Sequence, residues 1–250
     1  MNLIAQAFAW IFDPSHWTTS ALGTGIPDAL VQHLILSGVS LLIAAIIALP
    51  LGFYIGHTGK GRNVAIIASN ISRALPSLGL LSILLITITD PPFLPTGYLA
   101  NIIVFVILGI PPLLAGAYAG LEQVDRQTID AARSIGLTEL QILFKVEIPL
   151  GAELIVGGIR SSALQIIATV TIASVYGQIS LGTYIEGGYQ QGDYVEMTAG
   201  AILVAALALI VDGLLAIIQR FVVPRGLSRR PSKTRNTARG ALLASNTQGR

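Results

Sequence analysis

The feature that most constrains the fold is a series of five long apolar segments. They cover residues 34–56, 64–89, 98–121, 150–175 and 200–221. A helix needs about 20 mostly apolar residues to span a bilayer, and a backbone in lipid must satisfy its own hydrogen bonds. Only 11% of the residues are charged, whereas soluble domains carry about 25%. The segments therefore predict an all-α membrane protein with about five transmembrane helices.

The basic residues predict how these helices are oriented. Residues 1–33, 90–97 and 176–199 contain neither Lys nor Arg. Basic residues occupy the alternate connections instead, at Lys60, Arg62, Arg126, Arg133, Lys145 and from Arg220 onward. Because Lys and Arg accumulate in cytoplasmic loops, we expect the N-terminus outside and the C-terminus inside.

Three regions follow from this pattern. Residues 1–33 are expected to form an external arm that begins with a short interfacial helix, with Trp10 and Trp17 at headgroup level; a packed or disordered arm is the alternative. Residues 34–222 form the transmembrane domain. Residues 223–250 are basic and poor in apolar residues, so we expect a disordered cytoplasmic tail that either contacts anionic membrane lipid or has no role.

A polar connection at 122–149 is long for a chain this apolar. Opposite charges four residues apart (Glu122 with Arg126, Arg126 with Asp130) favour a first helix. Gly136 ends it, and Thr138 with Gln141 can form a capping box for a second helix that stops before Pro149. We expect this helix–turn–helix to be a docking surface for a soluble partner, formed by Asp130, Ala131, Ala132, Arg133, Ser134 and Gly136.

The motif Asp130-Ala131-Ala132, followed by Gly136 and Pro149, resembles the "EAA" loop of the binding-protein-dependent ABC importer permeases. That family usually has Glu in place of Asp130. The resemblance implies the permease fold, with this loop as the coupling helix for a separate cytoplasmic ATP-binding subunit. It also implies a separate extracytoplasmic substrate-binding protein, a second permease chain (a copy or a sister subunit) and the plasma (inner) membrane of a prokaryote. Cofactors are then absent from this chain, since ATP is bound by the partner.

Further segments resemble the subgroup that imports quaternary-amine osmoprotectants such as glycine betaine, choline and carnitine. They are His33-Leu34, residues 73–77, residues 158–160, and Leu181-Gly182 with Ile185 and Gly188. The alternatives are a permease for another small solute, such as an amino acid, and an ion-coupled secondary transporter.

Polar residues within the apolar segments suggest a translocation path or gate. Arg73, Arg160 and Asp212 lie deep in their segments, and Pro76 interrupts the second. A charge at mid-membrane costs about 2.5–3.5 kcal/mol, so these side chains should face the bundle interior or a water-filled vestibule. The alternative is that Asp212 neutralises one of the two arginines and pins the helices; the sequence does not say which arginine.

Two further patterns concern packing and substrate. The pairs Gly52–Gly56 and Gly116–Gly120 have the spacing of closely packed helices. Four tyrosines lie near the expected outer end but suggest no clear aromatic cage, so we expect the binding protein to set selectivity; they are Tyr176, Tyr184, Tyr189 and Tyr194.

Several functions are disfavoured. The chain has no cysteine and three scattered histidines, so no metal cluster is evident. Around Gly59-Lys60, Tyr54 and Gly61 replace the glycine and the Ser or Thr that a P-loop requires. The basic residues lie beside the membrane spans rather than on a nucleic-acid-binding face. No catalytic set is apparent, so the chain is not expected to be an enzyme.

Overall fold

The computed structural model describes residues 2–19 and 23–222. All secondary-structure elements of more than one residue in these ranges are helices. The predicted all-α fold is confirmed. The elements are α1 (Leu3–Phe12), η1 (Pro14–Trp17), α2 (Ile26–Thr58), α3 (Arg62–Ala74), α4 (Ser77–Thr87), α5 (Tyr98–Glu122), α6 (Arg126–Ser134), α7 (Glu139–Ile142), η2 (Leu143–Glu147), α8 (Ile148–Val170), η3 (Thr171–Tyr176), α9 (Gly182–Gln191) and α10 (Tyr194–Val222). The tail predicted at 223–250 lies outside the described residues.

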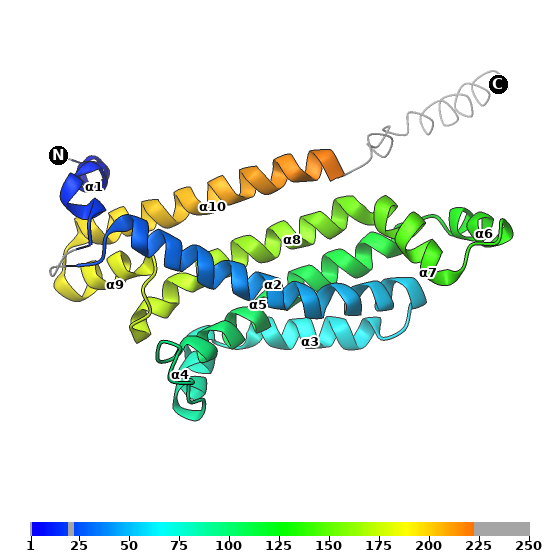
Figure 1. Cartoon of the computed structure of the whole chain (residues 1–250), viewed down its shortest axis with the longest axis horizontal. Coiled ribbons are helices and arrows are strands. Elements are labelled where there is room, and N and C mark those ends of the chain that lie inside the picture. The colour runs from blue at the N-terminus through cyan, green and yellow to red at the C-terminus, as the bar shows by residue number, and fades with distance from the viewer. Residues whose placement is uncertain (1, 20–22, 223–250) are drawn as a thin grey trace, which may run out of the picture.

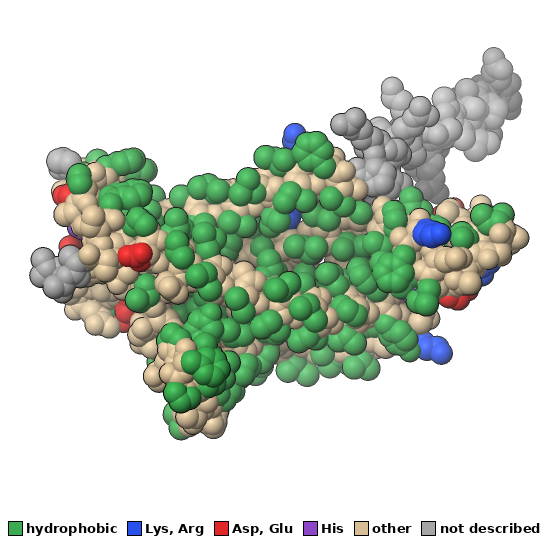
Figure 2. Space-filling view, viewed as in Figure 1, with side chains coloured by type: hydrophobic (Ala, Val, Ile, Leu, Met, Phe, Trp, Pro, Cys, Tyr) green, Lys and Arg blue, Asp and Glu red, His purple; other side chains and the backbone are tan. Residues whose placement is uncertain are grey.

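The long helices α2, α5, α8 and α10 run along one direction, with α1 and α9 at one end and α6 and α7 at the other (Figure 1). Apolar side chains cover the middle of the molecule (Figure 2). In the described residues, α2, α5 and α10 are each long and apolar enough to cross a membrane. The helix α8, at 23 residues, is long enough but more polar, since it carries Glu153 and Arg160. The predicted number of spans and their orientation stay predictions.

The second apolar segment is not one continuous helix. It divides into α3 and α4, whose axes are bent by 86° at the break. Only the two helices together are long and apolar enough to cross a membrane. The cause is Pro76, which lacks a backbone N–H and disfavours the helical region for the preceding Leu75. Leu75 is accordingly extended, with φ −70° and ψ 128°. The interruption expected at Pro76 is therefore present, and whether α3 and α4 together form one span of the membrane stays a prediction.

Glycines bring the central helices close together. A Cβ at Gly56 would lie 2.8 Å from Leu121 Cβ of α5, and one at Gly116 would lie 2.7 Å from Gly158 Cα of α8. Gly52 faces Ala117, and Gly120 faces Gly151. The two predicted small-residue pairs therefore do mark helix crossings, α2 on α5 and α5 on α8. Phe105 and Leu113 of α5 are fully buried between these helices.

The N-terminal segment forms a helix and packs on the bundle. Ala7 and Ile11 of α1 are buried against Ala199 of α10. The Trp17 indole N–H donates to Ile11 O at 2.7 Å and ties η1 to α1. A helix within residues 1–12 was expected from the sequence; its position at a membrane interface stays a prediction.

Candidate functional site

The connection between α5 and α8 folds into a projecting elbow, by which we mean α6, the turn at Gly136, α7 and η2 (residues 126–147; right-hand end of Figure 1). The Asp125 side chain caps α6 by accepting from Gln127 N at 3.0 Å. Gly136 has φ +89°, a left-handed conformation that favours glycine. Thr138 and Gln141 form the capping box of α7. The predicted helix, glycine turn and capped second helix are therefore present.

Two details of the elbow differ from the sequence prediction. The first helix begins at Arg126 rather than at Glu122, because Glu122 is the last residue of α5. Glu122 pairs with Arg62 at 3.5 Å instead of with Arg126. The second helix does not stop before Pro149. It continues through the π-helical turn η2 into α8, and Pro149 is the second residue of α8.

The apolar residues of the elbow divide between an inner and an outer side. The inner side is a small core of Val124, Ile129, Ala132 and Ile142. Ala132, which was predicted to face a partner, thus lies on the buried inner face of α6. The outer side exposes three large apolar side chains: Ile135 is 81%, Leu140 69% and Phe144 62% exposed. Ala131 is exposed as well. Leu140 and Phe144 were not singled out from the sequence.

Charged side chains brace the elbow across the turn. Arg133 Nε and Nη2 donate to the two Glu139 carboxylate oxygens at 2.7 and 3.0 Å, and Nη1 donates to Asp130 Oδ1 at 3.1 Å. This bidentate bond from Arg133 lowers the pKa of Glu139 and raises that of Arg133. Asp130 therefore pairs with Arg133 rather than with Arg126. Ser134 Oγ donates to Asp130 O at 2.9 Å.

A histidine connects the elbow to the end of α2. His57 Nδ1 lies 2.5 Å from Glu147 Oε2, and His57 Nε2 lies 3.3 Å from Glu139 Oε2. The Glu147 side chain is only 3% exposed. Because a buried carboxylate needs a partner, His57 fixes η2 against α2, and Glu139 links this contact to Arg133. No local pattern in the chain indicates this pair, since its members are 90 residues apart.

The residues predicted for a path or gate are only partly brought together. Arg160 of α8 forms a bidentate pair with Asp212 of α10, in which Nε donates to Oδ1 at 3.0 Å and Nη2 donates to Oδ2 at 2.9 Å. Arg160 Nη1 also donates to Gln219 Oε1 at 2.7 Å. The structure thereby identifies the partner of Asp212, and this pair joins two helices as the alternative interpretation expected. Pro76 lies at the α3–α4 break; Arg73 belongs to α3, and its side chain lies outside the described part.

The bundle defines a multi-pass helical membrane protein, and comparison with known proteins gives its family. Residues 48–225 match the family described as binding-protein-dependent transport system inner membrane component. The chain belongs to this family of prokaryotic inner-membrane permeases, which are transport proteins rather than enzymes.

The chain is similar to curated permeases over most of its length. It is 33% identical over 198 residues to the glycine betaine/carnitine/choline transport system permease protein OpuCB of Bacillus subtilis (strain 168), covering 78% of this chain and 88% of that one. It is 31% identical to the choline transport system permease protein OpuBB of the same organism, covering 79% and 88%. Among solved structures, an inward-facing MetNI methionine ABC transporter matches with a TM-score of 0.67 and 21% identity, covering 80% and 96%. This last likeness shows the ABC importer permease fold.

Proposed function

We propose that this permease subunit imports a small quaternary-amine osmoprotectant, such as glycine betaine, choline or carnitine. The observation that carries the proposal is the 33% identity over 78% of the chain to a relative named for these three solutes. Other similar relatives are named for choline and for carnitine transport. A methionine transporter shares the fold at 21% identity, so an amino-acid solute is the second candidate.

We propose further that a cytoplasmic ATP-binding subunit docks on the outer side of the elbow. Support comes from Ile135, Leu140 and Phe144, three large apolar side chains of the elbow that are exposed on either side of its charged turn. Such apolar anchors within a polar rim are typical of protein interfaces. The braces to Arg133 and His57 hold the elbow rigid, as transmission of a mechanical step requires. Movement of the docked subunit would then rock the helices as rigid bodies.

The remaining partners are an extracytoplasmic substrate-binding protein and a second permease chain, either a copy or a sister subunit. One observation supports a second chain or lipid around α10: only 6% of its most apolar stretch is buried within this chain. Leu209 and Ile210, for example, are 74% and 61% exposed. ATP would be bound by the partner subunit.

The test of substrate is uptake by proteoliposomes that contain the chain with its ATP-binding subunit and its binding protein. Labelled glycine betaine, choline, carnitine and methionine are offered in parallel, with and without ATP inside. We expect ATP-dependent uptake of at least one quaternary amine and none of methionine. Uptake of methionine alone would refute the proposed substrate class while leaving the family assignment intact.

The test of docking compares two phenylalanines. Phe144→Ala on the elbow should weaken capture of the ATP-binding subunit by about tenfold or more, because truncating an interface anchor costs about 2 kcal/mol or more. Phe93→Ala is the matched control, since Phe93 is 83% exposed in the α4–α5 connection, away from the elbow. Equal capture of both variants would contradict docking at this surface. Co-purification of tagged subunits in detergent gives the measurement.

A further inference from the structure

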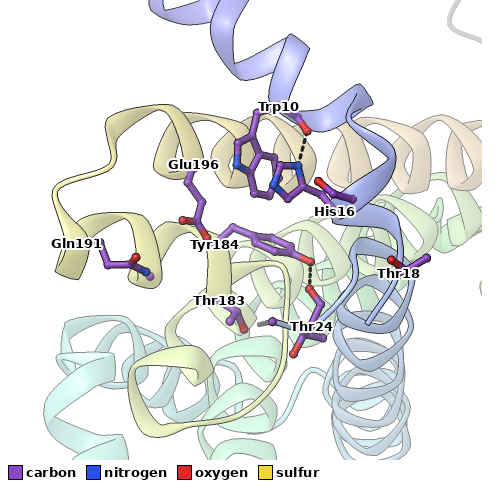
Figure 3. A pocket seen from close by; sticks show the side chains of 11 residues that line it. Trp10, His16, Thr18, Thr24, Thr183, Tyr184, Gln191 and Glu196 are labelled. Atoms are coloured by element: carbon purple, nitrogen blue, oxygen red, sulfur yellow. Dashed lines mark hydrogen bonds between the residues drawn. The ribbon is translucent and has the colours of Figure 1, made fainter. Parts of the chain in front are cut away.

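A cavity of about 470 Å³ lies at the end of the bundle opposite the elbow. It is an open cavity lined by residues of α1, η1, α9 and α10 and of the connection between η1 and α2 (Figure 3). Its size falls in the range of about 300–1,000 Å³ that is usual for small-molecule sites. The residues that give it chemical character are Trp10, His16, Tyr184 and Glu196. Because these come from four different elements, the sequence did not reveal them as a group.

Aromatic rings form one corner of this cavity. Trp10 and Tyr184 meet edge to face, with ring centroids 5.3 Å apart and planes at 69°. The His16 ring is held by its Nδ1, 2.8 Å from the backbone oxygen of Trp10, and it stacks on the Trp10 indole with ring centroids 3.8 Å apart. Tyr184 is held by donating its hydroxyl proton to Thr24 O at 2.8 Å. The aromatic corner is therefore preformed, which reduces the entropy lost on binding.

The charges at the cavity favour a cation. The Glu196 carboxylate stands beside Tyr184 (Figure 3), and Asp193 is near it. Residues 1–33 and 176–199, which supply every lining residue, contain no Lys or Arg. Burial and the nearby charges of Glu196 and Asp28 raise the pKa of Tyr184 to about 12. An aromatic corner beside a carboxylate is the chemistry that recognises an alkylammonium ion.

We propose that this cavity is a substrate subsite on the permease itself, which binds the quaternary ammonium group of the imported solute. The proposal rests on the proposed function. The ammonium group would lie in the corner between Trp10 and Tyr184, with Glu196 neutralising its charge. The lining contains three threonines, Thr18, Thr24 and Thr183, whose hydroxyl groups can donate to a hydroxyl group of the solute. Because a zwitterion brings its own carboxylate toward Glu196, choline should bind more tightly than glycine betaine.

The chain provides its own probe for this site. Its two tryptophans are Trp10 and Trp17, so Trp17→Phe leaves Trp10 as the sole indole, with the aromatic ring at position 17 retained. The full chain in maltoside detergent is titrated with choline, tetramethylammonium and glycine betaine while Trp10 emission is recorded. The matched ligand control is 3,3-dimethyl-1-butanol, which has the shape of choline with a neutral carbon in place of nitrogen.

We expect saturable emission changes with choline and tetramethylammonium, and an affinity about tenfold lower for the neutral alcohol. Glu196→Gln, which keeps the shape of the side chain, should abolish most of this difference. Tyr189→Leu is the control variant, since Tyr189 is 73% exposed and does not line the cavity. Equal affinity for choline and the neutral alcohol, or no effect of Glu196→Gln, would overturn the proposal.

The choline headgroup of a lipid has the same chemistry as the solute, so a second arm uses phosphocholine detergent below its micelle concentration. Saturation by this detergent but not by free choline would overturn assignment to a solute. Uptake by the complete transporter separates the two proposals. If Glu196→Gln and Trp10→Leu both take up choline or betaine as the wild type does, the subsite is refuted and the proposed function stands. Choline binding without any quaternary-amine uptake would remove the function instead.

Discussion

The crossing of α5 and α8 offers a test of the packing with an internal control. Gly157 and Gly158 are neighbours in α8, yet a Cβ at Gly157 would meet nothing within 4 Å. A Cβ at Gly158 would lie 2.8 Å from Pro112 O and 2.9 Å from Gly116 Cα, both backbone atoms of α5. The substitutions Gly157→Ala and Gly158→Ala therefore add the same methyl group to the same helix in two different environments.

The magnitude follows from these distances. Carbon atoms in contact prefer about 3.5–4.0 Å, so the Gly158 methyl group requires α5 and α8 to separate by roughly 0.6–1 Å. Backbone atoms cannot rotate aside, and overpacking of this kind costs about 1–3 kcal/mol. Both substitutions gain about 1 kcal/mol of helix propensity. That gain cancels in the comparison, so Gly158→Ala should be about 1–3 kcal/mol less stable than Gly157→Ala.

The assay is thermal unfolding in detergent, followed by the loss of monodisperse protein on size-exclusion chromatography. For a chain of this length about 1 kcal/mol corresponds to 2–4 °C, so the two midpoints should differ by roughly 2–12 °C. Gly157→Ala should match or exceed the parent protein. If the two variants unfolded at the same temperature, α5 and α8 would not cross at Gly158 and the arrangement of the central helices would be wrong.

Three further predictions concern buried and half-buried polar contacts. His57→Ala leaves the buried Glu147 carboxylate unpaired, so we expect a loss of about 3–5 kcal/mol, measured as a lower unfolding midpoint that Glu147→Gln in the same chain partly restores. Asp212→Asn should destabilise the chain by leaving Arg160 uncompensated, whereas Arg160→Met combined with Asp212→Leu should recover most of the stability; recovery of stability without transport would assign the pair to the pathway. His33→Leu removes a buried ring that contacts Ile167 O at 3.1 Å and Leu181 N at 3.3 Å, so about 1–3 kcal/mol should be lost for each group left unsatisfied, and an unchanged midpoint would contradict these contacts.

Local signals allowed much of the elbow to be predicted. Gly136 and the Thr138–Gln141 capping box act within a few residues, and the structure contains both. The ends of the two helices were less predictable. Glu122 is the last residue of α5 and pairs with Arg62, which is 60 residues away, rather than with Arg126. A pattern of charges along one helix does not reveal that a residue from another helix, here Arg62, takes the place of the expected partner.

The side on which an elbow residue lies was also beyond the sequence. Ala131 and Ala132 are adjacent and identical in type, yet Ala131 is exposed and Ala132 is buried against Ile129 and Ile142. In a short helix with few apolar residues, the buried face depends on where the following chain returns. Here the chain returns through η2, which continues directly into α8. Pro149 in the sequence indicated a helix end at this point instead.

The sequence by itself determined the helical membrane class, the glycine pairs at the helix crossings and the helix–turn–helix between α5 and α8. Those properties depend on apolar length, on residue size and on bonds within a few residues. Only the tertiary structure decided that Asp212 pairs with Arg160, that His57 holds Glu147, and that Trp10 meets Tyr184 beside Glu196. These contacts join residues from 52 to more than 160 positions apart, and such pairs are set by how whole helices pack rather than by any local preference of the chain.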